Sequence, residues 1–462
     1  MQIYNSLTRK KEEFISLEAG SVKMYACGPT VYNYFHIGNA RTFLFFDVVR
    51  KYLEYRGYDV TYVQNITDID DKIINQSIQE GIPATDVAAK YIEAFLKDTA
   101  KLGLTPPTHQ PLATKYIGQM IKLIRELEIA GFAYEVNGDV YFSVNKSSEY
   151  GRLSGRKTEE QKVGARVDKN TDKQNPADFT LWKRSKPGEP KWKSPWGEGR
   201  PGWHTECVVM SRDLLGATFD IHGGAIDLLF PHHENELAQA NALQTKPMVN
   251  YWMHGGFLNM RGEKMSKSLD NFLLTRDVFE KFDAETIRTF FLSKHYRSPI
   301  EYSPELLEEA KVAVNNFYDA LQDIRYLDFA QSETVVTDSA DEYKRKFQEM
   351  MDDDFNTAKA MSVLFDLSRK IKNQRDFSVE ERQGFALILV KFGKVLGFFS
   401  DIQARLAVTG LTDPLMKILI DLRAALKAEK NFVMADMIRE KLSKTGIELR
   451  DKKEGTTWSF RE

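Results

Sequence analysis

Cys27 and Cys207 are the residues of this chain whose chemistry is most specific, and the sequence contains no other cysteine. Well after Cys207 come His232 and Glu236, whose four-residue spacing would place both side chains on one face of a helix. Two thiolates, one imidazole and one carboxylate make a tetrahedral zinc-binding set. The plainer alternative is that each cysteine is a small buried apolar residue and that the His–Glu pair is an ordinary helix face. These residues alone leave both interpretations open.

Two further motifs have the composition of phosphate-binding elements. The first, residues 36–39, reads His-Ile-Gly-Asn and leads into a helix. Gly38 lets a ligand approach the backbone closely, and the N–H groups of a helix N-terminus favour an anion. His36 and Asn39 would add side-chain donors. The second motif, residues 264–268, reads Lys-Met-Ser-Lys-Ser and places two cations and two hydroxyls in one turn. Either motif alone could be an ordinary loop, but together they indicate a nucleotide site near the metal set.

The elements around these motifs alternate between strand and helix, which predicts a βαβ unit with a parallel sheet and a right-handed crossover. In such a sheet, ligands bind beyond the carboxyl ends of the strands, where Cys27 and His36 would lie. A capping box at Thr67 would start the second helix. The predicted order is a strand at 21–27, a buried helix at 38–55, a strand at 60–63 and a helix from Thr67 to Ile78.

The rest of the chain divides into an insertion, a second half of the sheet and a helical region. Asn137-Gly138 between alternating strands predicts a hairpin after helices at 84–102 and 112–130. The fold class is therefore α/β, with a Rossmann-like catalytic domain split by an insertion, then an α-helical bundle and a small α+β domain. The predicted boundaries are 1–110 and 203–257 for the two halves, 111–202 for the insertion, 258–303 for the region of the Lys-Met-Ser-Lys-Ser motif, 304–400 for the bundle and 411–462 for the last domain.

Composition sets broad limits on what the chain can be. Its 462 residues are enough for roughly three or four domains, and the net charge of −2 neither favours nor excludes a nucleic-acid partner. The first residues lack the apolar stretch of a secretory signal, and no run approaches the ~18 apolar residues of a membrane span. With only two cysteines in so long a chain, we expect a reducing, cytoplasmic location and no membrane association.

The two phosphate motifs, in this order and on either side of a split βαβ domain, resemble the HIGH and KMSKS elements of the class I aminoacyl-tRNA synthetases. The fourth HIGH position is Asn39 here instead of histidine, which still provides a hydrogen-bond donor. Longer runs are similar to the cysteinyl-tRNA synthetase family, and the match covers essentially the whole chain. These runs are residues 27–32, 65–72, 202–207, 230–236 and 455–458.

The resemblance implies a zinc ion and an ATP site. In that family the four positions that match Cys27, Cys207, His232 and Glu236 hold zinc. Shape alone separates cysteine from serine or alanine by only ~10- to 200-fold, whereas zinc prefers a thiolate at ~2.3 Å. Metal selection would make an editing domain unnecessary, and no segment of this chain requires one. The resemblance also implies ATP with Mg²⁺, bound by His36, Gly38, Asn39 and Lys267, with His36, Asn39, Lys264 and Lys267 as the catalytic residues.

Other residues are expected in the amino-acid pocket or at the tRNA. The resemblance places Thr67 and Trp203 in the substrate pocket. His204 and His233, next to metal ligands, would either support those ligands or face the substrate. Stacking on RNA is one reading of Trp182, Trp192 and Trp196, but a core or loop-packing role is favoured. In the C-terminal domain, most charges could simply face solvent, and the expected anticodon contacts are Asp436, Arg439, Asp451 and Trp458.

The implied activity is that of a cysteine–tRNA ligase. The cysteine carboxylate attacks the α-phosphorus of ATP to give cysteinyl adenylate, while Lys267 stabilises charge on the leaving pyrophosphate. The terminal adenosine hydroxyl of tRNA(Cys) then attacks the adenylate carbonyl, and the family implies a monomer. One alternative is a ligase of the mycothiol type, which acylates a small amine and lacks a domain like 411–462. A non-catalytic RNA-binding paralogue is another, against which His36, Lys264 and Lys267 argue.

Overall fold

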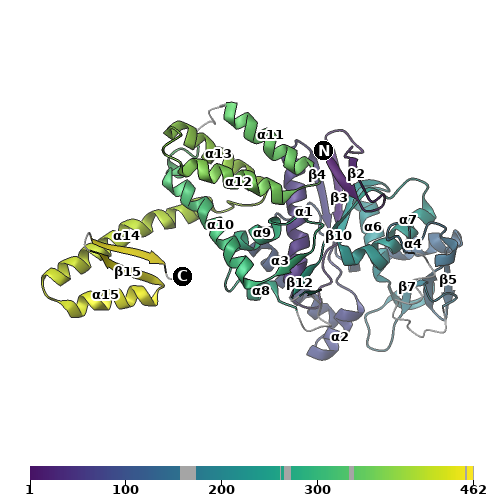
Figure 1. Cartoon of the computed structure of the whole chain (residues 1–462). Coiled ribbons are helices and arrows are strands. Elements are labelled where there is room, and N and C mark those ends of the chain that lie inside the picture. The colour runs from purple at the N-terminus through teal and green to yellow at the C-terminus, as the bar shows by residue number, and fades with distance from the viewer. Residues whose placement is uncertain (157–172, 261, 265–271, 332–337, 453–454, 461–462) are drawn as a thin grey trace. The chain divides into compact units, whose positions relative to one another are not determined.

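The computed structural model describes residues 1–156, 173–260, 262–264, 272–331, 338–452 and 455–460. The chain forms two compact units, coloured along the chain in Figure 1. The first unit contains residues 1–315, 336–366 and 388–398, and the second contains 316–335, 367–387 and 399–462. Lys267 lies outside the described residues, and for Lys264 only the backbone is described.

A four-stranded parallel sheet forms the centre of the first unit, which confirms the predicted α/β fold. Its strand order is β11 (Val249–Gly255), β10 (Phe219–Ala225), β3 (Ser21–Ala26) and β4 (Asp59–Gln64). These strands are almost entirely buried on both faces, as expected of a parallel sheet covered by helices. The carboxyl ends of the four strands lie at one edge of the sheet, and β3 ends immediately before Cys27.

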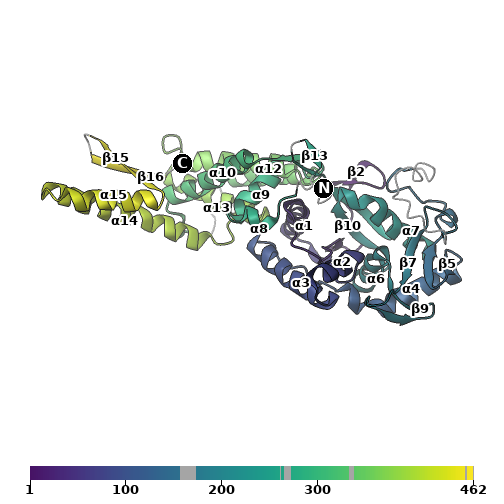
Figure 2. The ribbon, with the colours of Figure 1, turned by 90° about the horizontal axis from the view of Figure 1, so that it is seen from below.

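Helices cover both faces of this sheet. In Figure 2, α1 (Ile37–Tyr55) lies on one side of β10, and α6 (Trp203–Leu215) and α7 (Glu234–Leu243) lie on the other. The alternation of β10 explains the division. Gly223 faces α1 so closely that a Cβ atom would lie 2.0 Å from the ring of Phe46, whereas His222 faces α7. Only glycine at position 223 therefore lets α1 approach the sheet. Two further helices, α3 (Ala84–Lys101) and α9 (Ala284–Leu292), share a buried apolar cluster with α1.

The predicted helix start at Thr67 is wrong. α2 (Asp71–Glu80) begins four residues later, with Asp70 as its N-cap, whose carboxylate accepts a hydrogen bond from the backbone N–H of Lys72. The hydroxyl of Thr67 instead donates to a carboxylate oxygen of Glu206, at 2.7 Å. The Thr67 side chain, which the local pattern assigned to a helix cap, thus binds Glu206, a residue remote in sequence.

The insertion contains α4 (Ile117–Ile129), whose start lies five residues after the predicted one, and a five-stranded antiparallel sheet. Asn137 and Gly138 both have positive φ, as the two-residue hairpin requires. Trp182 is fully buried, and the indole N–H of Trp196 donates to Glu128, so both tryptophans pack within the insertion. The order of the strands is β5 (Ala133–Val136), β6 (Asp139–Phe142), β7 (Phe179–Arg184), β9 (Gly197–Pro201) and β8 (Trp192–Ser194).

Shorter elements complete the first unit and lead into the helical region. A hairpin of β1 (Gln2–Asn5) and β2 (Lys10–Glu13) opens the chain, and a small sheet follows β11. That sheet contains β12 (Leu258–Met260), β13 (Glu263–Lys264) and β14 (Ile300–Tyr302), with α8 (Thr275–Val278) between its last two strands. The helices that follow are α10 (Pro304–Asp323), α11 (Asp338–Asp352), α12 (Thr357–Lys372) and α13 (Val379–Val395).

α14 (Ile402–Ala428) spans the residues between the predicted bundle, 304–400, and the predicted last domain, 411–462. It is followed by α15 (Phe432–Lys444) and a hairpin of β15 (Ile447–Lys452) and β16 (Gly455–Phe460). The side chains of Met416, Leu442 and Leu449 form a small core here. No helix in the described ranges is both long enough and apolar enough to cross a bilayer.

Candidate active site and metal centre

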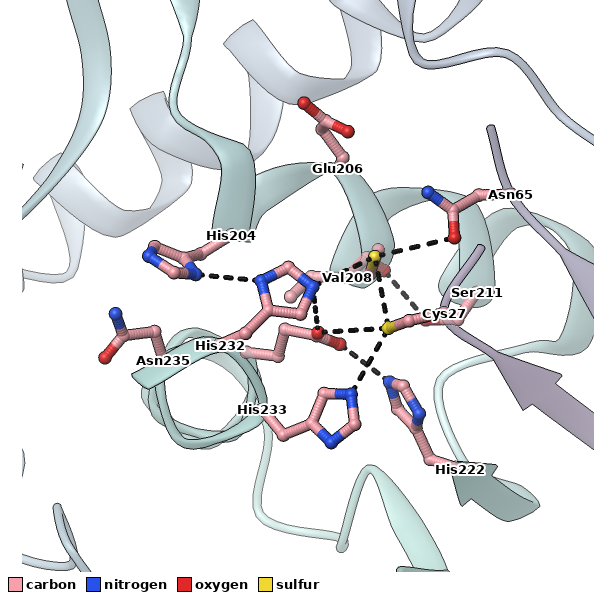
Figure 3. A network of polar contacts seen from close by, with 12 residues as sticks. Cys27, Asn65, His204, Glu206, Val208, Ser211, His222, His232, His233 and Asn235 are labelled. Carbon is pink, nitrogen blue, oxygen red and sulfur yellow. Dashed lines mark hydrogen bonds and ion pairs between the residues drawn. The ribbon is translucent and has the colours of Figure 1, made fainter. Parts of the chain in front are cut away.

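Four side chains from distant parts of the sequence meet at the edge of the parallel sheet. Cys27 follows β3, Cys207 lies in the first turns of α6, and His232 and Glu236 lie at the start of the α7 region; all four are buried. The two Sγ atoms are 3.7 Å apart, and Cys207 Sγ is 3.5 Å from His232 Nε2. Glu236 Oε1 lies 3.8 Å from Cys27 Sγ and 3.0 Å from His232 Nε2 (Figure 3). The predicted donor set is therefore brought together.

These separations fit a tetrahedral zinc ion. With zinc–sulfur bonds of ~2.3 Å and zinc–nitrogen or zinc–oxygen bonds of ~2.0–2.1 Å, the edges of a tetrahedron are about 3.8 Å between two sulfurs, about 3.6 Å between sulfur and nitrogen, and about 3.4 Å between nitrogen and oxygen. The observed sulfur–sulfur and sulfur–nitrogen separations agree within about 0.1 Å, and the others within about 0.4 Å. The donor chemistry and the spacing of these four residues thus match zinc.

A second set of possible ligands shares two of these residues and adds His222 and His233. Its separations fit a zinc tetrahedron less well than those of the first set, because the nitrogen–oxygen distance is about 0.7 Å shorter than the edge. His222 Nε2 lies 2.7 Å from Glu236 Oε2, and His233 Nε2 lies 3.2 Å from Cys27 Sγ. These are hydrogen-bond distances. His222 and His233 therefore support the ligands Glu236 and Cys27 from outside the tetrahedron.

Without a metal, the cluster must distribute its protons among the four ligands. Burial raises the pKa of Cys27, and the nearby Cys207 and Glu236 raise it further. Burial also works to raise the pKa of Cys207, but hydrogen bonds from Cys27 and His232 outweigh it and lower that pKa to about 6. Burial works to lower the pKa of His232, yet Glu236 and Cys207 raise it to about 10. The site thus favours a cation among its anionic ligands.

Histidine is concentrated around this centre to a degree that the sequence analysis missed. His233 Nδ1 lies 2.8 Å from His254 Nε2, and His254 Nδ1 lies 2.8 Å from the hydroxyl of Ser6. Burial lowers the pKa of His254 to about 3, so this side chain is neutral at pH 7. The available signal was the count, because five of the eight histidines fall between positions 204 and 254: His204, His222, His232, His233 and His254.

A cavity of about 240 Å³ connects the four-ligand centre to the N-terminus of α1. Cys27 and Trp203 line it at one end, and His36 and Asn39 line it at the other. The ring of Trp203 stacks on His232, with centroids 4.0 Å apart and an interplanar angle of 19°. Trp203 therefore contacts both His232 and the cavity, and its role as a wall of the substrate pocket stays a prediction. Lys72, which the sequence analysis did not single out, also lines this cavity.

His36 and Asn39 form a capping box at the N-terminus of α1. The Nδ1 atom of His36 accepts from the backbone N–H of Asn39, and Asn39 Oδ1 accepts from the backbone N–H of His36, both at 3.3 Å. This geometry commits Oδ1 to the cap and leaves the amino group of Asn39 as the donor end. A contact from His36 to phosphate would use Nε2. The substitution of asparagine for the usual histidine thus serves the helix cap as well.

The region around Thr67 packs beside Cys207, whose Sγ lies 3.9 Å from Asn65 Oδ1. Glu206 points away from the cluster, accepts from the Thr67 hydroxyl, and keeps its other oxygen without a hydrogen-bond partner among the described residues (Figure 3). Burial raises the pKa of Glu206 well above its usual value. Asn65 Oδ1 accepts from the backbone N–H of Gly28, where a Cβ atom would lie 1.6 Å from the Asn65 carbonyl oxygen. Glycine at position 28 is therefore required next to Cys27.

The remaining predicted site residues lie elsewhere. His204 Nδ1 lies 2.9 Å from His232 Nδ1, which places it against a metal ligand. The backbone of Lys264 pairs with Asn259 in the small sheet. In the second unit, Asp436 and Arg439 are exposed on α15, and Trp458 packs partly against the small core. Asp451 accepts from Arg423 at 2.7 and 3.0 Å and from Lys427 at 3.0 Å, so a base contact there would compete with these cations.

Comparison with known proteins supplies close relatives. Residues 13–312 match the family described as tRNA synthetases class I (C) catalytic domain, and residues 346–400 match the DALR domain. The chain is 48% identical to the cysteine–tRNA ligase of Carboxydothermus hydrogenoformans over 464 residues, covering 99% of both chains. It is equally similar to the cysteine–tRNA ligase of Clostridioides difficile, with 48% identity over 468 residues and 99% of both chains covered.

Solved structures with much lower identity share the fold. A leucyl-tRNA synthetase from Agrobacterium radiobacter, in a ternary complex with tRNA, has a TM-score of 0.63 at 11% identity and covers 85% of this chain and 86% of its own. A methionyl-tRNA synthetase from Mycobacterium tuberculosis, in complex with methionyl-adenylate, has a TM-score of 0.55 at 15% identity, with 81% and 89% covered.

Proposed function

The chain belongs to the cysteine–tRNA ligases of the class I aminoacyl-tRNA synthetases, and from this premise we propose where its chemistry takes place. L-Cysteine and ATP react in the cavity between the four-ligand centre and the N-terminus of α1 to form cysteinyl adenylate. The cysteinyl group then passes to the terminal adenosine of tRNA(Cys). The observation that carries the proposal is that one cavity joins Cys27 to His36 and Asn39.

The metal would be held by Cys27, Cys207, His232 and Glu236, whose spacing fits a tetrahedral site. When bound, Zn²⁺ supplies a position that takes the thiolate of cysteine and discriminates against the hydroxyl of serine. Trp203 closes the cavity on the side of His232 and restricts the space beside that position. His222 holds the carboxylate of Glu236 by its second oxygen, which fixes the direction of the first.

ATP would bind with its phosphates at the N-terminus of α1. The positive end of the α1 dipole favours an anion there, and the Asn39 amino group and His36 Nε2 provide donors. Mg²⁺ would accompany the triphosphate. Lys264 and Lys267 would stabilise the negative charge that develops on the pyrophosphate as the cysteine carboxylate attacks. These assignments follow the motif and the family, and Lys267 stays a prediction outside the described residues.

The tRNA is expected to contact both units, with the anticodon read by the second one. The residues predicted for this role are Asp436 and Arg439, which are exposed, together with Asp451 and Trp458. We expect the active protein to be a monomer, which size-exclusion chromatography with light scattering would test.

The test combines metal analysis with ATP–pyrophosphate exchange. Wild-type protein should contain one zinc per chain and show exchange that depends on cysteine and not on serine. Cys207→Ser removes a ligand, so we expect loss of the metal and a fall in exchange of more than about 100-fold, because loss of even a supporting residue around a metal costs up to that much. Ser211→Ala, one turn further along α6, is the matched control and should retain both.

Two outcomes would contradict this proposal. Exchange at the wild-type rate in the Cys207→Ser protein would remove that residue from the metal centre. Metal-free wild-type protein that still rejects serine would show that selection does not depend on zinc. Charging of tRNA, followed with labelled cysteine, completes the test of the second step.

A further inference from the structure

Arg41 is a buried cation whose guanidinium is surrounded by backbone carbonyl groups. It lies in α1, in the turn that follows His36, and is only 4% exposed. Its Nη1 donates to the carbonyl oxygens of Gly256 at 2.8 Å and Phe257 at 2.6 Å. Its Nη2 lies within hydrogen-bond distance of three more carbonyl oxygens, which belong to His295, Tyr296 and Ser298. One side chain thus joins α1 to two separate segments of backbone.

The two segments continue the sheet on the nucleotide side. Residues 256–257 leave the carboxyl end of β11, where Gly255 pairs with Ala225, and Ala225 lines the cavity of the proposed active site. Residues 295–298 lead into β14, which pairs in parallel with β12. The backbone N–H of Gly256 donates to the carbonyl of Tyr296 at 2.7 Å, and a Cβ atom on Gly256 would lie 2.6 Å from the Arg297 carbonyl oxygen. The two backbones are therefore in direct contact where Arg41 reaches them.

The second segment also has contacts that do not involve Arg41. Asp354 accepts from the hydroxyl of Tyr296 and from Arg297 Nε, both at 2.8 Å. The ring of Tyr296 stacks on Phe45, one turn beyond Arg41 in α1, with centroids 4.0 Å apart and planes 10° apart. Because Asp354 and Phe45 hold residues 295–298 in place, Arg41 connects residues 256–257 to a segment that is itself fixed.

Arg41 has no acidic partner among the residues that the structure describes. Burial lowers its pKa to about 10, which still leaves the guanidinium charged at pH 7. Arg288, an equally buried arginine in α9, pairs instead with the carboxylate of Asp47 at 3.0 Å. Burying a charge is costly, and the neutral carbonyls around Arg41 compensate only through their dipoles. A planar guanidinium whose two terminal nitrogens donate in fixed directions to carbonyls of both segments has a geometry that lysine or a neutral residue would lack.

We propose that Arg41 is a positioning residue for ATP. It holds the chain at the carboxyl end of β11 at a fixed distance from the N-terminus of α1. A nucleotide in this kind of sheet lies across the carboxyl ends of the strands, so both sides of its site depend on that distance. The cysteine side of the cavity is built on β3, α6 and α7 and does not depend on Arg41. The inference rests on the proposed function, since it assigns the nucleotide to the α1 end of the cavity.

The test compares Arg41→Gln and Arg41→Lys with Arg288→Gln. This control removes another buried arginine, which lies in α9. Zinc content, thermal stability and the KM values for ATP and cysteine are measured in ATP–pyrophosphate exchange. For Arg41→Gln we expect the ATP KM to rise about tenfold and kcat to fall by up to about 100-fold, because small misplacement of a reacting group has costs of this size. The cysteine KM and the zinc content should stay at wild-type values.

The other variants separate positioning from charge and from general damage. Arg41→Lys keeps the charge but cannot reach five carbonyls, so it should recover less than a tenth of the lost kcat. Arg288→Gln should lower the melting temperature without changing the ATP KM. If Arg41→Gln does not fold, Arg41→Lys decides the question alone.

The proposal is overturned if the Arg41 variants keep a wild-type ATP KM and kcat, or if their cysteine KM rises as much as their ATP KM. Full recovery by Arg41→Lys would assign the effect to charge and would equally overturn the positioning role. If the wild-type protein shows no cysteine-dependent exchange, the function proposed above fails instead. Binding of ATP to the same proteins, measured by calorimetry, then still tests Arg41, with the expected weakening about tenfold.

Discussion

Three of the four candidate metal ligands have a histidine beside them. His222 binds the outer oxygen of Glu236, His233 contacts Cys27, and the Nδ1 atoms of His204 and His232 are 2.9 Å apart. Such contacts fix the orientation of a ligand before the metal arrives. They also explain why so many histidines are buried here, because a neutral imidazole can serve as a donor on one side and an acceptor on the other.

At this scale, zinc affinity should increase with pH. The pKa of His232 is raised to about 10 in the metal-free cluster, and burial together with Cys207 and Glu236 raises that of Cys27, so at neutral pH both side chains carry protons that metal binding must displace. We expect zinc binding to release protons and to tighten steadily between pH 6 and pH 8. Calorimetric titrations of the metal-free protein in buffers with different ionisation enthalpies would measure the number released. An affinity independent of pH would contradict this description of the cluster.

Among the elements, α1 has the largest number of separate tasks. Its first turn carries the His36–Asn39 cap, Arg41 reaches the backbone beyond β11, and Asp47 binds cations from two directions. Asp47 is only 2% exposed and accepts from Arg288 at 3.0 Å, from the backbone N–H of Thr105 at 3.0 Å, and from Lys51. The helix is thereby fixed against α9 and against the chain that follows α3.

Asp47→Asn should destabilise the first unit and change its response to acid. Burial works to raise the pKa of Asp47, but Arg288 and Lys51 outweigh it and lower the pKa below its usual value. A lowered carboxyl pKa adds stability above the unfolded value of ~3.9, and that stability is lost as pH falls through the folded value. The variant leaves two cations without their partner, so we expect a loss of about 3–5 kcal/mol at pH 7.

Chemical denaturation at pH 7 would measure this loss, and melting curves between pH 7 and pH 3 would test its origin. The variant should lose less stability than the wild type as the pH falls below about 4, because it has no carboxylate to protonate. Glu54→Gln is the control, since its partner Arg50 lies on the same helix but the pair is at the surface and should contribute under about 1 kcal/mol. Equal stability of Asp47→Asn and wild type would contradict the role of the pair.

The whole molecule is divided into two compact units that the proposed reaction uses differently. The cavity, the metal centre and α1 all belong to the first unit. In the second unit, Arg423 is 2% exposed and holds the carboxylate of Asp451 with both of its terminal nitrogens, which fastens the β15–β16 hairpin to α14. We propose that formation of the adenylate needs only the first unit, whereas charging of tRNA needs both.

Arg423→Gln should therefore separate the two steps. Loss of the fork leaves Asp451 without its main partner and loosens the hairpin, so we expect tRNA charging to fall roughly tenfold, the equivalent of about 1.4 kcal/mol. ATP–pyrophosphate exchange should remain within twofold of wild type. Lys444→Gln, which removes an exposed pair with Glu440 on α15, is the control and should affect neither. A parallel loss of exchange and charging would contradict the division of labour between the units.

Local patterns in the sequence predicted the order of elements and suggested a donor set, which the residue types alone left open. A hairpin at Asn137-Gly138, a buried helix after Gly38 and a His–Glu pair at four-residue spacing are properties of neighbouring residues, and the structure confirms the hairpin, the helix and the meeting of the pair with Cys27 and Cys207. Longer runs similar to one family added the activity, which no local pattern contains.

Only the tertiary structure decided which distant side chains meet. The sequence predicts that Thr67 caps a helix, but in the structure its hydroxyl donates to Glu206, far along the chain. In the sequence Arg41 is an ordinary polar position of a helix. In the structure it lies within hydrogen-bond distance of five carbonyls from two later segments. The reason is physical: periodicity reports which face of an element is buried, whereas the partner of a buried polar group is set by packing between elements that are remote in sequence.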